Sequence, residues 1–396
     1  MTLPRRITIT REGWYYLLVL ALVFAGAMAR EVNLLLVLAG LLLGPLVFNL
    51  HAVVVALRGL EVRRKMPQGV CAGDLLVAGV SLSNARRRVG TWGVVVEDEL
   101  QPESGQAAGL AREKAIRPAV LFPYVPAGES RKGVYRGRLV RRGRYRLGPL
   151  RVSTRFPFGL FCRTIVVGAT ETLTVFPRLG RLTQGWAARQ HEAFAGTHRR
   201  ERRHGQEGDF YGLRPWRSGD SRRWIHWRSS ARSGKLVVRQ LEQPRNRDVA
   251  VLLDLREPAE PTPQHAEHVE LAVSFAATVL GDLCRKGGST LHLGTSEPQP
   301  QCISGPASLA LLQDMMQRLA VAEAHNSDHL AELLERLLGE IEPGSEIVLV
   351  STQPIDLADT TRFAALWADT SRRTLLRRIR CVDTSSAELA EYFQAE

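Results

Sequence analysis

Cysteine is scarce in this sequence, and no two cysteines form a Cys-x-x-Cys pair. The 396 residues include an odd number of them, scattered along the chain: Cys71, Cys162, Cys284, Cys302 and Cys381. A disulfide framework needs paired cysteines in a short secreted chain, and a zinc site needs closely spaced ligands. We therefore expect buried free thiols in a reducing compartment, with neither a disulfide framework nor a zinc site.

The common catalytic motifs are also missing. No glycine-rich loop precedes a Lys-Ser or Lys-Thr pair, so any ATPase activity must belong to another chain. The run from His265 to His268 lacks the spacing of a zinc-protease helix. His226 and Ser230 stand four residues apart, but the sequence indicates no oriented base or oxyanion hole beside them. We expect a protein that is not an enzyme and uses no cofactor, and we keep an unknown hydrolytic activity as an alternative.

Acidic residues are scarce in the first 248 residues, where 18 of them face 42 lysines and arginines. The remaining residues carry 22 acidic and 11 basic side chains, and the whole chain has a formal net charge of +13. Two halves of opposite charge are suited to attract each other. A basic half is also typical of a surface that faces anionic lipid or an acidic partner.

Two long apolar runs lie near the N-terminus, WYYLLVLALVFAGAMA (Trp14 to Ala29) and VNLLLVLAGLLLGPLVFNL (Val32 to Leu50). A bilayer crossing needs about 20 mostly apolar residues, so each run is long enough or nearly so. Basic residues flank the pair on both outer sides: Arg5, Arg6 and Arg11 before it, and Arg58, Arg63, Arg64 and Lys65 after it. Positive flanks favour the cytoplasmic side. The sequence therefore predicts a transmembrane helical hairpin over residues 1–58, with the bulk of the chain in the cytoplasm.

Two alternatives to the hairpin remain. Ala27-Met28-Ala29 resembles the small-residue cleavage site of a signal peptide, although the second run would then stop transfer and leave the body inside. Both runs would otherwise be core helices of a soluble protein, which their lack of a polar face argues against.

The region from Leu60 to Leu179 has the pattern of β structure. LLVAGVSL alternates apolar residues on one side, and the long basic run from Lys132 to Val152 predicts two strands about a turn near Arg142-Gly143. Short strands separated by glycine and proline are typical of a sandwich. We expect a β-sandwich-like domain over residues 60–180.

Strands and helices alternate from Asp248 onward. DVAVLLDL, GSTLHLG, EIVLVST and RRIRCVD predict strands, and helices are expected over Glu267 to Arg285, Ala307 to Ala320 and Asp328 to Leu338. This alternation indicates a parallel sheet covered on both faces. A doubly wound α/β domain is therefore predicted over residues 248–396.

A connector over residues 184–247 contains the basic, tryptophan-rich segment RPWRSGDSRRWIHWRSSARSGK, from Arg214 to Lys235. Its one acid, Asp220, follows Ser218-Gly219 and is placed to cap a helix from Ser221 to about Ala231 and to pair with a nearby arginine. Trp224, Trp227 and Ala231 would form one packed stripe on that helix. The following KLVVRQLEQ would run as a strand beside DVAVLLDL. We expect a structural junction at which Arg214, Asp220, Arg223, Trp227, Arg232 and Lys235 form the interaction cluster.

The run GDFYGLRPWRSGDSRRWIHWRSSARSGKLVVRQLEQP, together with RRGRYRLGPLRV, FPFGLF and VFPRL, resembles the bacterial domain of unknown function 58 (DUF58) family. The resemblance covers nearly the whole chain and implies a membrane hairpin, a β-rich domain and a C-terminal region similar to a von Willebrand factor A domain. It implies a multi-pass protein of the bacterial cytoplasmic (inner) membrane. The family has no established catalytic activity.

A von Willebrand A-like domain often holds a metal ion through Asp-x-Ser-x-Ser after its first strand, because a hard divalent ion favours carboxylate and hydroxyl oxygens. Here the aligned residues are Asp254, Arg256 and Pro258. Arg256 and Pro258 replace both hydroxyl ligands. We therefore expect a degenerate site at Asp254 that binds no metal.

The expected function is that of an adaptor or assembly protein in an undefined process. Members of the resembled family are often encoded beside MoxR-type AAA+ ATPases and transglutaminase-like membrane proteins, which are the expected protein partners beside the lipid bilayer. Nucleic-acid binding through the basic Arg/Trp segment is the main alternative, since arginine neutralises phosphate and tryptophan stacks on bases. The packed tryptophan stripe argues against it.

Overall fold

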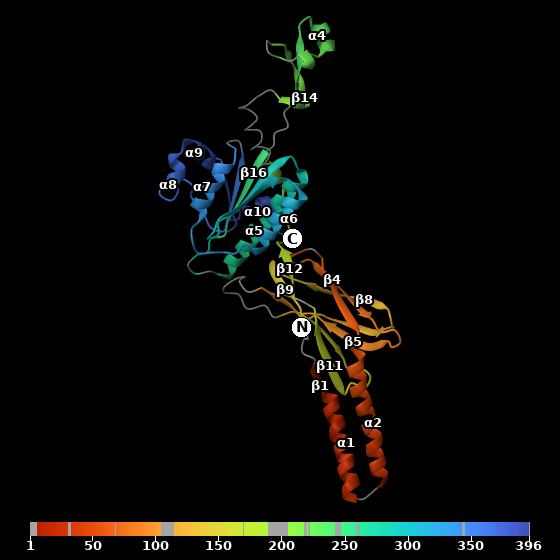
Figure 1. The fold of residues 1–396 in the computed structure, drawn as a ribbon. Coiled ribbons are helices and arrows are strands. Elements are labelled where there is room, and N and C mark those ends of the chain that lie inside the picture. Colours follow the sequence, from red (N-terminus) through yellow and green to blue (C-terminus); the bar gives the residue numbers. More distant parts are fainter. Residues whose placement is uncertain are drawn as a thin grey trace. The chain divides into compact units, whose positions relative to one another are not determined.

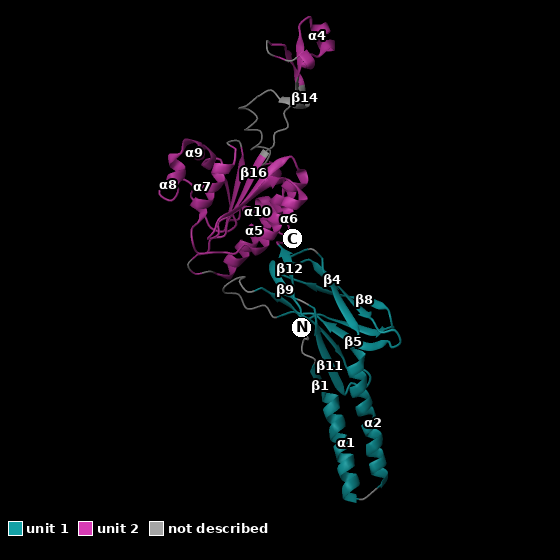
Figure 2. Ribbon diagram, in the orientation of Figure 1, with its two compact units in different colours: residues 1–176 teal, residues 177–396 magenta. Residues whose placement is uncertain are grey.

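The computed structural model describes residues 6–395 apart from 31–32, 68, 104–114, 169, 189–204, 218–219, 221, 242–246, 259, 261 and 343–344. The chain is a mixed α/β protein with two N-terminal apolar helices and several sheets (Figure 1). It divides into two compact units, Met1–Phe176 and Pro177–Glu396, which Figure 2 shows in teal and magenta. Each unit has a hydrophobic core of its own.

The two apolar helices are α1 (Arg11–Arg30) and α2 (Asn33–Ala56), which lie side by side in Figure 1. The hydroxyl of Tyr16 donates a hydrogen bond to the Leu42 carbonyl across the pair, at 2.7 Å. Among the described residues, these are the two helices long and apolar enough to cross a membrane, with mean hydropathies of 1.5 and 2.1. The expected turn at Glu31 and Val32 lies outside the described residues.

Side chains of the β structure cap the C-terminal end of α2. Arg86 donates to the carbonyls of Val55 and Ala56, both at 3.2 Å, and the Thr91 hydroxyl donates to Ala56 at 2.8 Å. The last carbonyls of a helix have no partner within it, and the helix dipole makes that end attractive to cations. Arg86 therefore satisfies both needs at once.

One polar residue inside α2 fastens the helix laterally. Asn49 is fully buried, and its Oδ1 accepts hydrogen bonds from the backbone N–H groups of Leu160 (3.1 Å) and Phe161 (3.0 Å). Val53, one turn further along, packs against the same two residues. The end of α2 is thus part of the first unit's folded structure.

The described residues of the first unit form three sheets around one core. Their orders are β1-β11-β10-β5-β7, β3-β12-β9-β6 and β2-β4-β8. The strands are β1 (Arg6–Ile9), β2 (Leu60–Lys65), β3 (Val70–Cys71), β4 (Leu75–Asn84), β5 (Thr91–Glu97), β6 (Leu100–Pro102), β7 (Ala119–Val125), β8 (Ser130–Arg138), β9 (Gly143–Leu147), β10 (Leu150–Thr154), β11 (Phe161–Val167) and β12 (Glu171–Phe176).

The alternating pattern predicted for β4 is confirmed, because Leu76, Ala78, Val80 and Leu82 are all buried in the core. Strands also flank the predicted turn at Arg142 and Gly143. They do not pair with each other, however, since β8 pairs with β4 while β9 pairs with β12 and β6. The chain changes sheets at that turn.

The second unit is built on a five-stranded sheet of order β18-β17-β16-β19-β20. Its strands are β16 (Arg247–Asp254), β17 (Ser289–Thr295), β18 (Gln301–Pro306), β19 (Glu346–Ser351) and β20 (Arg380–Asp383). Pairings within β17-β16-β19-β20 are parallel, as expected, and β18 is antiparallel to β17. The short strands β13 (Arg181–Leu182) and β21 (Phe393–Gln394) form a separate pair.

Helices pack on both faces of this sheet (Figure 1). Ala250 and Leu252 of β16 belong to the core built with α7 (Leu330–Glu340), α8 (Ala364–Ala368) and α9 (Thr370–Leu376). The other face packs against α5 (Pro263–Lys286), which lies beside α6 (Leu309–Val321), and α10 (Leu389–Tyr392) is the last helix. Side chains alternate across a strand, so the continuous apolar run in β16 serves both faces.

The strand expected from KLVVRQLEQ does form, as β15 (Val237–Leu241), but its predicted neighbour is wrong. It pairs with β14 (Gly205–Pro215), whereas the two neighbours of β16 are β17 and β19. The basic segment therefore belongs to a hairpin of its own, and most of the connector before it lies outside the described residues.

Candidate functional site

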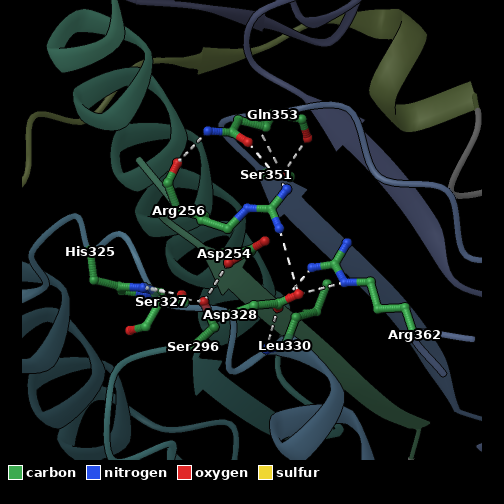
Figure 3. Close-up of polar contacts among 10 residues, drawn as sticks. All are labelled: Asp254, Arg256, Ser296, His325, Ser327, Asp328, Leu330, Ser351, Gln353 and Arg362. Carbon is green, nitrogen blue, oxygen red and sulfur yellow. Dashed lines mark hydrogen bonds and ion pairs between the residues drawn. The ribbon is translucent and has the colours of Figure 1, made fainter. Parts of the chain in front are cut away.

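The candidate site lies at the carboxyl end of the central strand β16, where Asp254 is the last residue (Figure 3). Asp254 is 1% exposed, and its Oδ1 accepts a hydrogen bond from the Ser296 hydroxyl at 2.6 Å. Within the described part of the chain, no hydrogen-bond donor reaches its Oδ2. Burial raises the pKa of Asp254 above its usual value, and the Ser296 hydrogen bond and nearby positive charge only partly offset this.

His325 lies on the other side of Ser296, with its Nε2 3.3 Å from the serine oxygen. Its Nδ1 lies 2.8 Å from the Ser327 carbonyl, which only accepts, so Nδ1 carries the hydrogen. Ser296 has one hydroxyl hydrogen, and the short bond assigns it to Asp254. A hydrolytic triad places the imidazole between the acid and the serine. Here the serine lies between them, so the geometry is not that of a nucleophile with its base.

Arg256 connects Asp254 and its neighbours to a group of further polar and charged side chains. Its guanidinium donates to Gln353 Oε1 at 3.1 Å and lies 3.5 Å from Asp328 Oδ2. Arg362 contacts the same Asp328 from another segment, at 2.7 and 2.8 Å (Figure 3). Burial alone would raise the pKa of Asp328, but the hydrogen bond and charge of Arg362, the Leu330 N–H and the charge of Arg256 together outweigh it, and the pKa is lowered. Two arginines thus share one carboxylate beside Asp254.

The donor set at this strand end does not fit a divalent ion. Ser351 donates to the Gln353 carbonyl at 2.5 Å, and Thr352 donates to the Arg256 carbonyl at 2.8 Å, so both hydroxyls already have acceptors. The one buried carboxylate, Asp254, is accompanied by the Arg256 charge rather than by the oxygen ligands that magnesium or calcium requires. The described residues also include no cluster of three or more His, Cys, Asp or Glu suited to a metal.

Sequence reasoning identified Asp254 and Arg256 but missed four of their partners: Ser296, His325, Asp328 and Arg362. One signal was available for Ser296, which directly follows strand β17. The carboxyl ends of parallel strands meet at one edge of a sheet, so residues just after them gather there. His325 and Asp328 lie between helices, and nothing in the local pattern places them.

In the basic segment, Asp220 pairs with a nearby arginine, as predicted, and that arginine is Arg214. The guanidinium nitrogens donate to both carboxylate oxygens at 2.7 Å, and the Arg217 N–H donates to Oδ2 at 2.8 Å. The two paired side chains are 17% and 20% exposed. The hydrogen bond to Asp220 is the main reason that the pKa of Arg214 is raised. Ser218, Gly219 and Ser221, used in the cap prediction, lie outside the described residues.

The single helix expected over Ser221 to Ala231 is replaced by two short ones, η1 (Arg222–Trp224) and α4 (Trp227–Ser233). The break has a tertiary cause. Ile225 forms a bridge to Val238 of β15, and the His226 N–H donates to the Val237 carbonyl at 2.8 Å. His226 then caps α4, accepting from the Ser229 N–H at its Nδ1.

Ser230, the other half of the candidate His–Ser pair, has a structural role. Its buried hydroxyl donates to the His226 carbonyl at 3.1 Å and accepts from the Val237 N–H at 2.9 Å. The histidine ring contacts the hydroxyl of Ser229 instead, at 2.8 Å. Ser230 therefore joins α4 to β15, and the candidate hydrolytic pair is not formed.

The predicted tryptophan stripe is wrong. Trp227 is 67% exposed, Ala231 is exposed and Trp224 is only half-buried. The apolar anchor of this hairpin is Ile225, at 8% exposure. The remaining predicted interaction residues, Arg223, Arg232 and Lys235, are exposed as well. Of the six predicted residues, the structure thus brings Arg214 and Asp220 into contact and leaves the other four on the surface.

The five cysteines are free thiols. They are less buried than expected, since Cys284 alone of the five is buried and Cys381 is exposed.

Comparison with known proteins relates part of the chain to one protein family. The family described as "Protein of unknown function DUF58" matches residues 212–392. The chain is also 24% identical over 298 residues to the "Uncharacterized protein YeaD" of Bacillus subtilis, covering 74% of this chain and 71% of that protein. Both findings support membership of the DUF58 family, and neither assigns an activity.

Two similar solved structures each cover less than a third of the chain. The CARDB domain of the PF1109 protein from Pyrococcus furiosus is 14% identical, covering 29% of this chain and 91% of that one, with a TM-score of 0.19. The C-terminal domain of wzt is 11% identical, covering 30% and 73%, with a TM-score of 0.21. Scores of this size support no conclusion about fold or function.

Proposed function

We propose, from its likeness to the DUF58 family, that this chain is an adaptor or assembly protein anchored in the bacterial cytoplasmic membrane by α1 and α2. Both helices are long and apolar enough to span a bilayer, and arginines flank them at Arg11 and Arg58. Positive flanks favour the cytoplasm, so the remainder of the chain would face that side. Asn49 and Arg86 fasten the anchor to the β sheets.

The observation that carries a docking role is the exposed cationic surface of the β14–β15 hairpin. The Arg214–Asp220 pair and the Ile225 anchor hold its backbone, while its outer residues are turned to solvent: Arg222, Arg223, Trp227, Arg228, Arg232 and Lys235. Trp216, at 36% exposure, is a second exposed tryptophan of the segment. A preorganised surface rich in arginine with exposed tryptophans is typical of a binding element. An acidic protein surface is its electrostatic complement.

The partner proposed for this surface is a MoxR-type AAA+ ATPase, with a transglutaminase-like membrane protein as a further partner. The proposal follows from the DUF58 resemblance. We also propose that the second unit is a von Willebrand A-like domain that uses no metal. Its mainly parallel sheet, with Asp254 ending the central strand, supports the first part, and Arg256 beside Asp254 supports the second.

The adaptor proposal is tested by capture from detergent-solubilised membranes with the full chain as bait, read by mass spectrometry. Wild type should enrich a AAA+ ATPase, and a variant with Arg223→Ala, Arg232→Ala and Lys235→Ala should lose it, more clearly at low salt where charge attraction is least screened. Arg63→Ala, which removes an 81% exposed arginine from the first unit, is the matched control. Equal capture by all three proteins would contradict the docking role.

Orientation has its own test. A fluorescent-protein fusion after Glu396 should be fluorescent, and an alkaline-phosphatase fusion at the same place should be inactive, because the phosphatase folds only outside the cytoplasm. The reverse result would reject the cytoplasmic placement.

Nucleic-acid binding stays as a second candidate function, because Trp227 is exposed rather than packed. An exposed tryptophan among arginines can stack on a base while the cations neutralise phosphates. Binding of the full chain to labelled single strands is the decisive measurement. If this function holds, affinity should fall steeply with salt and Trp227→Ala should abolish binding without lowering the melting temperature. No binding at physiological salt would remove this candidate.

A further inference from the structure

A group of exposed aromatic side chains lies on the β structure of the first unit. Trp92, Tyr124, Phe156 and Phe158, here called the aromatic face, are 48%, 40%, 42% and 53% exposed. The Trp92 ring lies 4.2 Å from that of Tyr124 and 5.9 Å from that of Phe156, measured between centroids. Large exposed apolar groups that gather in one place mark a surface that something else covers.

The aromatic face is next to the two apolar helices. Phe158 lies 6.1 Å from Phe48 of α2, between ring centroids. Two residues further on, the Leu160 carbonyl accepts from the N–H of Thr10, the residue before α1, at 3.1 Å. Leu160 is also bonded to Asn49 of α2. The chain from Phe156 to Leu160 therefore lies beside the start of α1 and the last turns of α2.

Helix geometry indicates where this contact would lie relative to a bilayer. At 1.5 Å per residue, α1 spans about 30 Å, the thickness of the hydrocarbon core of a bilayer. Its first turn carries Arg11, and Trp14 and Tyr15 follow at 62% and 70% exposure. Tryptophan and tyrosine at a helix end are typical of the interface between lipid and water. Phe158 lies at this same end of the helix pair.

We propose that the aromatic face inserts into the headgroup region of the phospholipid bilayer, so that the first unit contacts the membrane with its sheet as well as with its helices. This proposal rests on the proposed anchoring of α1 and α2. Continuity with the helices favours lipid over a protein as the covering partner, because the face begins where Phe158 meets Phe48.

Charge around the face is consistent with this assignment. Arg155 precedes Phe156 and is exposed, and Arg87 and Arg88 are exposed next to the Arg86 that caps α2. Cations at this level attract anionic headgroups. Two acidic residues also lie near the face. Glu12, in the first turn of α1, interacts with Arg155. Glu97 lines a pocket together with Phe156 and Phe158, although it stands six residues beyond Thr91 and thus about 20 Å along β5 from the end of α2.

Photo-cross-linking of the full chain in vesicles of phosphatidylethanolamine and phosphatidylglycerol tests the proposal. Benzoylphenylalanine replaces one of three residues: Phe158 in the aromatic face, Leu22 on α1 as a probe of the anchor, or Val140 as the control. Val140 is 73% exposed and follows β8 at the end where Arg138 pairs with Leu75, opposite the end of β4 near α2. The expected result is a lipid adduct at Leu22 and Phe158 and none at Val140.

The other outcomes separate this inference from the anchoring itself. An adduct at Leu22 with none at Phe158 overturns the insertion of the aromatic face and leaves the anchor standing. No adduct at either position overturns both. An adduct of Phe158 with a protein chain, in place of lipid, assigns the face to a protein partner and overturns the proposal. Equal lipid adducts at Phe158 and Val140 show unspecific contact and overturn it too.

Discussion

Each compact unit contains a buried aspartate, and the two carboxylates differ greatly in the hydrogen bonds that they accept. Asp98 of the first unit, 2% exposed, accepts two hydrogen bonds from Arg64, at 2.8 and 2.6 Å. It also accepts from the Tyr135 hydroxyl at 2.7 Å and from a backbone N–H at 2.8 Å. Asp254 of the second unit, 1% exposed, has one hydrogen bond, from Ser296, and an Oδ2 that no described donor reaches.

The difference separates a structural carboxylate from a candidate functional one. A buried charge with a bidentate arginine and further donors has its desolvation cost largely compensated. A buried carboxylate oxygen without a donor costs stability, and such a cost is typical of positions retained for another reason. The arginines near Asp254 pair with Asp328 instead. The buried Asp254 carboxylate at the strand end of the second unit thus lowers stability in a way that the Asp98 carboxylate does not.

The largest test of this comparison is Asp98→Ala. It leaves Arg64, whose side chain is 1% exposed, with only the half-exposed Glu171 at 3.5 Å as a carboxylate partner, and the free energy of unfolding should fall by about 3–5 kcal/mol. Chemical denaturation of the detergent-solubilised full chain measures this. Glu61→Ala, which removes an exposed partner of Arg63, is the matched control and should change little. If Asp98→Ala lowered the free energy of unfolding no more than Glu61→Ala does, the Asp98 carboxylate would not be a strongly stabilising one, and the comparison with Asp254 would fail.

Asp254→Asn is the opposite test. It keeps an oxygen for Ser296 and removes the charge that burial disfavours, so the free energy of unfolding at neutral pH should rise by about 1 kcal/mol. Asp98→Asn, measured in the same way, should lower it. Destabilisation by both substitutions would show that Asp254 is as well compensated as Asp98.

The pH dependence sharpens the same point. Because burial raises the folded-state pKa of Asp254, the folded protein holds this proton more tightly than the unfolded chain. Its contribution to stability is therefore present at low pH and falls as pH rises from the usual aspartate value through the raised pKa. The pKa of Asp328 is lowered, so its contribution is lost as pH falls. Denaturation of wild type and Asp254→Asn across acidic pH should converge at the lowest values.

The smallest expected effect is that of metal. Millimolar magnesium or manganese should leave the melting temperature unchanged, because a ligand that does not bind the folded state cannot stabilise it. Differential scanning fluorimetry with and without EDTA measures this. A saturable rise that disappears in Asp254→Ala would mean that Asp254 Oδ2 is a metal ligand, and would explain its lack of a donor.

The α/β region was predictable because its helices are long and periodic. The expected helix over Glu267 to Arg285 is α5 (Pro263–Lys286), and those near Ala307 and Asp328 are α6 and α7. Buried strands such as β16 stand out as apolar runs of the right length. In such elements, burial determines which positions are apolar, so the sequence pattern indicates the structure.

The basic segment was predicted poorly because its structure depends on distant partners. The stripe formed by Trp224 and Trp227 requires one continuous helix, but the pairing of Ile225 with Val238 breaks it. Seven residues of α4 are too few for periodicity to decide the matter. That Asp220 pairs with an arginine follows from opposite charge, but the fold of the hairpin decides that its partner is Arg214, six residues before it. Tertiary contacts of this kind leave no mark in the local pattern.

The cap on α2 has a mechanical consequence. Since Arg86 and Thr91 hold the carbonyls of Val55 and Ala56, α2 cannot turn about its axis or tilt without carrying the sheets of the first unit along. Its 24 residues span about 36 Å, more than the roughly 30 Å of a bilayer's hydrocarbon core. A helix with such excess length tilts, and more so in a thinner membrane. If α2 spans the bilayer, membrane thickness would therefore set the angle at which the first unit stands on the surface.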